Sequence, residues 1–149
     1  MLARLPDGLR AVRTLHAPRA AVWEAWVDPA RLRAWWGPPG IAVPELEGDL
    51  RVGGSYRIVM EGPDGERRVL VWSFREIVPP ERLAFDWQWV SGPEAGAPSR
   101  VTVELREVGD RTEVEITHSG LLDAAIRDSH ATGWVACLDG LDETLNQMV

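Results

Sequence analysis

Three histidines and one cysteine are the side chains of this sequence best suited to acid–base, nucleophilic or metal chemistry: His16, His118, His130 and Cys137. The spacing of the histidines matches no metal-binding motif, and one cysteine can form neither an intramolecular disulfide nor a cysteine-rich metal site. The serines do not fit a nucleophile elbow, and the glycine-rich stretches lack the lysine of a phosphate loop. The sequence therefore predicts no catalytic set, no metal site and no cofactor.

Tryptophan is the other unusual feature, because eight tryptophans stand beside one tyrosine and two phenylalanines. An indole joins a large apolar surface to a single N–H donor, which suits the wall or rim of a binding pocket. Trp35 and Trp36 are adjacent and directly precede Gly37-Pro38-Pro39-Gly40, which should end a helix. We expect one of these indoles to pack onto a sheet and the other to lie along the rim of a cavity. The alternative is that both only seal the core.

The pattern of apolar residues predicts the elements that position these side chains. A strand beginning near Gly8 is followed by two short helices that are separated at Asp28-Pro29. About six antiparallel strands come next, and then apolar residues at helical spacing predict one long amphipathic C-terminal helix. The expected turns are Gly53-Gly54, Pro63-Asp64-Gly65, Pro79-Pro80 and Gly109-Asp110. We predict a single α+β domain over residues 1–149, in which one face of a bent sheet is solvated and the other wraps the helix.

The inward positions of the predicted strands are rich in aromatic residues. Such a face opposite one helix either packs solid or leaves a cavity, and ligand sites are typically apolar cavities with a few polar groups. His118 ends a strand on the inward parity, and His130 shares the helix stripe of Trp134; either could instead be a hydrogen-bonded core residue. The predicted ligand-binding residues are Trp26, Trp35, Trp36, Tyr56, Met60, Trp72, Phe74, Phe85, Trp87, Trp89, His118, His130, Trp134 and Leu138.

Two further residues of the predicted C-terminal helix matter for this cavity. Gly133 lies in mid-helix, where glycine costs about 1 kcal/mol relative to alanine. That cost is tolerable if the helix backbone approaches the sheet closely, or if something must fit against it. Cys137 falls on the apolar stripe, and we predict that it is an inert core residue.

The charge and the composition narrow the classes of partner. A net charge of −7 at pH 7 argues against nucleic acid, because phosphate binding needs clustered lysine and arginine. The composition, with 45% hydrophobic and 26% charged residues, is that of a globular protein. Neither a secretory segment nor a long apolar span is evident, so we expect no membrane insertion and a cytoplasmic location.

Five segments, taken in order, resemble the activator of heat-shock-protein-90 ATPase homologue-like family of the START-like (SRPBCC, Bet v 1-like) superfamily. They are "APRAAVWEAWVDPARLRAWWGPPG", "GDLRVGGSYRIVM", "EIVPPERLAFDW", "RTEVEITHSGL" and "GWVACLDGLDETL". The resemblance extends from about Leu9 to Leu145. It implies a helix-grip fold, in which a bent antiparallel sheet of about six or seven strands wraps a long C-terminal helix and two short helices close one end.

The resemblance also implies a function, because most of the superfamily binds lipids, sterols, polyketides or other apolar molecules in its cavity. We therefore predict a non-catalytic module that binds a small hydrophobic or aromatic ligand. One alternative is an aromatase/cyclase- or hydrolase-like enzyme that uses His118 or His130 as its acid–base group. Another is a stress-response protein that contacts a chaperone, as the eukaryotic cochaperones of the family do. Small domains of this fold can also form homodimers, so a homodimer is a further expectation.

Overall fold

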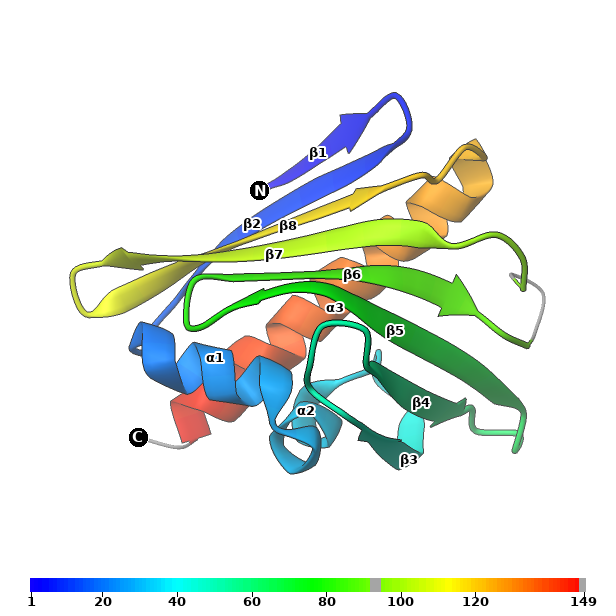
Figure 1. Ribbon diagram of the computed structural model, residues 1–149, viewed down its shortest axis with the longest axis horizontal. Helices are drawn as coiled ribbons and strands as arrows, with labels where there is room; N and C mark the ends of the chain where they lie inside the picture. Colours follow the sequence, from blue (N-terminus) through cyan, green and yellow to red (C-terminus); the bar gives the residue numbers. More distant parts are fainter. Residues whose placement is uncertain (92–94, 148–149) are drawn as a thin grey trace.

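A computed structural model describes residues 1–91 and 95–147 of the chain. Within these residues, eight strands form one antiparallel sheet in the order β1-β2-β8-β7-β6-β5-β4-β3 (Figure 1). The strands are β1 (Leu2–Leu5), β2 (Gly8–Leu15), β3 (Ala42–Gly48), β4 (Ser55–Glu61), β5 (Arg67–Val78), β6 (Arg82–Trp89), β7 (Ser99–Val108) and β8 (Arg111–Ser119). The helices are α1 (Arg19–Val27), α2 (Pro29–Trp35) and α3 (Ala124–Gln147). The predicted α+β fold class, the bent sheet and the long C-terminal helix are confirmed.

Over the described residues the sheet has eight strands, one more than the upper number of the six or seven expected, and β1 is the strand that was not predicted. It pairs antiparallel with β2, from Leu2 opposite Ala11 to Leu5 opposite Gly8. Its four residues are exposed or only partly buried. So short a segment at the edge of the sheet gives too little alternation of apolar and polar residues to be recognised as a strand.

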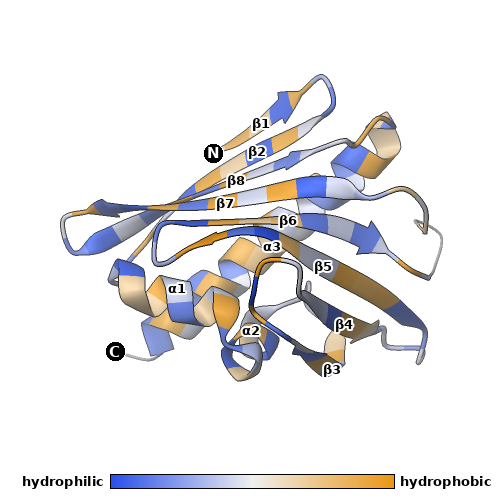
Figure 2. Cartoon of the chain, in the orientation of Figure 1, coloured by the Kyte–Doolittle hydropathy of each residue, from blue (hydrophilic) through white to orange (hydrophobic). Residues whose placement is uncertain are grey.

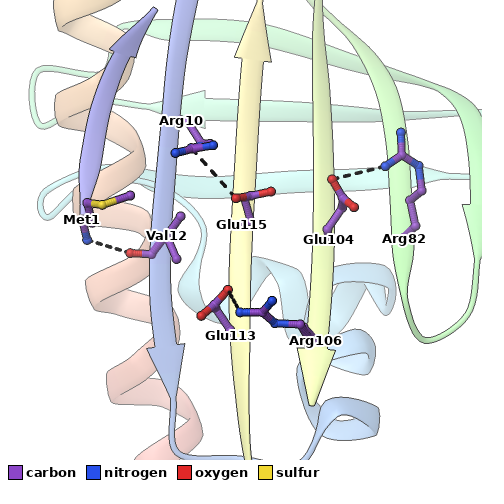
Figure 3. A network of polar contacts seen from close by, with 8 residues as sticks. All are labelled: Met1, Arg10, Val12, Arg82, Glu104, Arg106, Glu113 and Glu115. Carbon is purple, nitrogen blue, oxygen red and sulfur yellow. Dashed lines mark hydrogen bonds and ion pairs between the residues drawn. The ribbon is translucent and has the colours of Figure 1, made fainter. Parts of the chain in front are cut away.

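The predicted alternation along the central strands is confirmed by their burial. In β7, Val101, Val103 and Leu105 are buried, while the residues between them are exposed or partly buried. The opposite face carries cross-strand ion pairs, such as Arg106 with Glu113 at 2.6 Å (Figure 3). Figure 2 shows the same alternation as bands of apolar and polar residues along the strands. One face of the sheet therefore meets solvent, and the other holds the core.

Helix α3 crosses the inner face of the sheet, with α1 and α2 beside its C-terminal half (Figure 1). The side chain of Asp123 caps the start of α3, where its Oδ1 accepts from the backbone N–H of Ala125 at 2.8 Å. Further along, the guanidinium of Arg13 on β2 bonds to the carboxylates of Asp139 and Asp142. The cap stabilises the start of α3, and the contacts of Arg13 hold its C-terminal half against β2.

The two short helices begin and end as the sequence predicts. Pro29 opens α2, and the Oδ1 of Asp28 accepts from the N–H of Ala30 at 3.0 Å. After Trp36 the backbone of Gly37 takes a positive φ of 97°, which favours glycine and turns the chain toward β3. Trp35 and Trp36, which precede this turn, are both buried.

Candidate functional site

A cavity of about 330 Å³ lies between the inner face of β4, β5 and β6, the loop after α2, and the N-terminal half of α3. We call it the sheet–helix cavity. The sheet and the turn after β4 contribute Met60, Gly62, Pro63, Asp64, Glu66, Arg68, Trp87 and Trp89. The loop after α2 contributes Trp36, Pro38 and Ile41, and α3 contributes Ser129, His130, Gly133, Trp134 and Cys137. Because Asp64 and Glu66 are exposed, this end of the cavity reaches the surface.

Three tryptophans from different elements form the inner wall of the cavity. The ring centroids of Trp36 and Trp134 are 5.5 Å apart, those of Trp87 and Trp134 are 5.4 Å apart, and those of Trp36 and Trp87 are 5.8 Å apart. The rings are tilted or edge-to-face, as the quadrupoles of aromatic rings favour. Trp89 lies next to Trp87, at 5.7 Å. This wall is aromatic and presents mainly apolar surface to the cavity.

His130 is the buried polar group of the cavity lining, and both of its ring nitrogens are hydrogen-bonded. Its Nδ1 lies 2.8 Å from the carbonyl oxygen of Ile126, which can only accept, so Nδ1 carries the proton. Its Nε2 accepts from the indole N–H of Trp89 at 3.1 Å. The imidazole thus ties α3 to β6 at the cavity and holds the indole of Trp89 in place.

His118 is fully buried beside the cavity and does not line it. The indole N–H of Trp134 donates to Nδ1 of His118 at 3.0 Å, so Nε2 carries the proton and donates to Oγ of Ser99 at 2.7 Å. Desolvation, and secondarily the nearby His130, lower the pKa of His118 to about 3.

This geometry bears on the hydrolase hypothesis. A catalytic serine must give its proton to the imidazole, whereas here Nε2 of His118 donates to the oxygen of Ser99. A histidine with a pKa of about 3 is also a weak general base at neutral pH. The Ser99–His118–Trp134 chain therefore has the arrangement of a buried structural network.

The structure separates the predicted ligand-binding residues into two groups. Six line the cavity: Trp36, Met60, Trp87, Trp89, His130 and Trp134. The others are buried but lie outside the lining: Trp26, Trp35, Tyr56, Trp72, Phe74, Phe85, His118 and Leu138. Many of these pack where α1 and α2 fill the space above the sheet; the rings of Trp72 and Phe85, for example, stack at 4.2 Å. Which residues contact a ligand stays a prediction.

The two adjacent tryptophans have different environments. Trp36 packs onto Trp72 of the sheet at 5.1 Å and lines the cavity. Trp35 does not lie along the rim: its N–H donates to the carbonyl oxygen of Ala25 at 2.9 Å, and its ring meets Trp26 edge-on at 4.9 Å. Trp35 therefore joins α2 to α1.

Gly133 and Gly140 of α3 have different surroundings. A Cβ added at Gly140 would lie 3.0 Å from the carbonyl oxygen of Trp35, so this glycine allows α2 to approach the helix. A Cβ added at Gly133 would meet nothing within 4 Å, and this residue lines the cavity. Gly133 is therefore not explained by a close approach of the helix backbone to the sheet. The structure shows open space beside the helix at this residue, which agrees with the other explanation, that something must fit against it.

Several lining residues were not predicted as ligand-binding residues. Arg68 shares the inward parity of Leu70, Trp72 and Phe74, so the alternation of β5 could have identified it. Cys137 is buried as expected and also lines the cavity. Burial raises the pKa of its thiol to about 11, although a hydrogen bond from the backbone of Gly37 opposes the shift, so the thiol is protonated at neutral pH.

Among the described residues, no group of three or more histidine, cysteine, aspartate or glutamate side chains could hold a metal ion. Within residues 1–91 and 95–147, none of the helices has both the length and the apolar character needed to span a membrane.

Comparison with known proteins agrees with this architecture. The sequence profile of the family described as "Activator of Hsp90 ATPase homolog 1-like protein" matches residues 16–146. A crystal structure of protein CV1439 from Chromobacterium violaceum has a TM-score of 0.86 and 27% identity, over 95% of this chain and 98% of that one. The AHSA1 protein SPO3351 from Silicibacter pomeroyi has a TM-score of 0.81 and 29% identity, over 94% and 98% of the two chains. No curated protein matches the chain in sequence.

Proposed function

This chain belongs to the family of Activator of Hsp90 ATPase homolog 1-like proteins, and from its cavity we propose that it binds a small hydrophobic or aromatic molecule without catalysing a reaction. The binding site is the sheet–helix cavity. Its size lies at the lower end of the range of about 300–1,000 Å³ that is usual for ligand pockets.

One observation carries this proposal: a hollow of about 330 Å³ lined by four indoles lies beside a glycine that has no packing role there. Protein interiors are normally close-packed, and voids larger than a water molecule are few. A mid-helix glycine also lowers stability relative to alanine. A chain that keeps both features gives up stability at this position, which is typical of functional sites.

Fluorescence provides the test, because Trp36, Trp87, Trp89 and Trp134 line the cavity. Titration with decan-1-ol and with 1-naphthol should change the tryptophan emission and saturate. The variant Gly133→Leu should fold and lose this response, because its side chain fills the cavity. Val135→Leu is the matched control, since Val135 lies on the same helix, is 40% exposed and is outside the lining.

Two results would contradict the proposal. The first is the absence of any saturable change with either probe in the unmodified protein. The second is an unchanged response in Gly133→Leu, which would place the binding elsewhere.

Contact with a chaperone and formation of a homodimer stay predictions of the family resemblance. A change in the ATPase rate of a chaperone on addition of the purified chain would support the first. Sedimentation velocity over a range of protein concentrations would test the second.

A further inference from the structure

The lining of the sheet–helix cavity includes an arginine, Arg68, that forms no ion pair with any of the described residues. Arg68 lies opposite Met60 in the β4–β5 register and continues the inward row of Leu70 and Trp72 on β5. Its side chain is partly buried and belongs to the cavity lining. A partly buried guanidinium at an apolar cavity favours an anionic partner, because a charge pair is stronger where the surroundings hold less water.

Other arginines of the chain have their partners within the protein. Arg67, the next residue along β5, pairs with Glu61 at 3.4 Å. Arg33 donates to the carbonyl oxygens of Val43 and Pro44. Across residues 1–91 and 95–147, by contrast, the side chain of Arg68 makes neither an ion pair nor a hydrogen bond.

Two carboxylates share the lining with Arg68 but form no ion pair with it. Asp64 and Glu66 lie on the exposed turn between β4 and β5, where Oδ1 of Asp64 accepts from the backbone N–H of Glu66 at 3.3 Å. Neither carboxylate lies within 4.0 Å of the guanidinium of Arg68. The positive charge therefore remains available to a molecule that enters from this end.

We infer that the cavity takes a carboxylic acid with an apolar body, whose carboxylate pairs with Arg68 while the body lies against Trp36, Trp87 and Trp134. A guanidinium binds a carboxylate through two parallel N–H···O hydrogen bonds, which fixes the orientation of the ligand. The volume of about 330 Å³ corresponds to roughly eleven groups of the size of a water molecule, at about 30 Å³ each. An acid of about ten carbon atoms has this size. The inference rests on the proposed function and specifies its ligand class.

The test compares decanoate with decan-1-ol, which has the same chain without the charge. Affinities are measured by tryptophan fluorescence at pH 7.5 for the unmodified chain and for Arg68→Gln. The unmodified chain should bind decanoate at least about tenfold more tightly than decan-1-ol, because a hydrogen bond to a charged group contributes at least this difference in affinity. Arg68→Gln should lose this preference, and its affinity for decan-1-ol should change by less than about twofold.

Arg67→Gln is the matched control, because it removes the same charge one residue away on the other face of the strand. It should leave both affinities unchanged. If it weakens decanoate as much as Arg68→Gln does, the preference is a long-range charge effect and the pairing with Arg68 is wrong. Arg68→Lys provides a second variant if Arg68→Gln does not fold. Arg68→Lys should keep only part of the preference for decanoate over decan-1-ol. Full retention of that preference would contradict bidentate pairing of the carboxylate with the guanidinium.

The outcomes separate this inference from the proposed function. Equal binding of decanoate and decan-1-ol, with no effect of Arg68→Gln, would overturn the carboxylate assignment and leave a hydrophobic site in place. Failure of both probes to bind would overturn the proposed function itself.

Discussion

Replacing Gly133 with alanine should stabilise the protein by about 1 kcal/mol. Neither Gly133 nor Gly140 has a positive φ, so helical backbone geometry does not require glycine at either position. The methyl group of Gly133→Ala would enter the sheet–helix cavity without meeting another atom within 4 Å. The variant therefore gains helix propensity without overpacking. For a chain of this length the gain corresponds to a rise in melting temperature of about 2–4 °C.

Gly140→Ala makes the same chemical change on the same helix and should have the opposite effect. Its methyl carbon would lie 3.0 Å from the carbonyl oxygen of Trp35, so α2 would have to move. Overpacking of this kind costs about 1–3 kcal/mol, which equals or exceeds the gain in helix propensity. Urea unfolding followed by circular dichroism measures both variants. Destabilisation by Gly133→Ala would refute the assignment of free space beside Gly133, and stabilisation by Gly140→Ala would refute the close approach of α2 to Gly140.

The structure makes three further predictions. The pKa of His118 is about 3 in the folded chain and 6.5 is its ordinary value, so the unfolded chain binds more protons between these pH values. The free energy of unfolding should therefore fall as the pH drops below about 6.5, by at most about 1.4 kcal/mol per pH unit. In His118→Gln, urea unfolding measured between pH 6.5 and 5 should show a smaller fall. Trp134→Phe leaves Nδ1 of His118 without its donor and should lower the free energy of unfolding by about 1–3 kcal/mol, while an unchanged urea midpoint would contradict the hydrogen bond. Cys137, with its raised pKa of about 11, should react with a thiol reagent at pH 8 much more slowly than the same thiol in urea, and equal rates would show that it is accessible.

Much of the fold could be predicted from the sequence because its elements carry strong local signals. The hairpin between β7 and β8 alternates cleanly on both sides of Gly109, and α3 has a continuous apolar stripe. β1 was not predicted, because its four residues contribute little to the core. β1 is held in place by its pairing with β2. The ammonium group of Met1 also donates a hydrogen bond to the carbonyl oxygen of Val12 on β2, at 2.7 Å.

The position of the cavity could be predicted only in part. Alternation shows which face of a strand is inward, but not where along the strand the space remains open. Trp72 and Trp87 share the inward face, yet Trp72 is stacked on Phe85 and only Trp87 lines the cavity. The difference arises because α1 and α2 cover one end of the sheet; the phenolic oxygen of Tyr56, for example, donates to the carbonyl oxygen of Val27 at the end of α1. Such contacts between distant segments are absent from any local pattern.

The most direct measurement follows the indole N–H resonances by two-dimensional NMR while decan-1-ol is added. If the sheet–helix cavity holds the ligand, the signals of its four indoles, Trp36, Trp87, Trp89 and Trp134, shift and saturate together, while the signal of Trp23 on α1, outside the lining, stays in place. Unmoved signals from the four lining indoles, or larger shifts at Trp23, would contradict the claim that the space between the sheet and α3 holds the ligand.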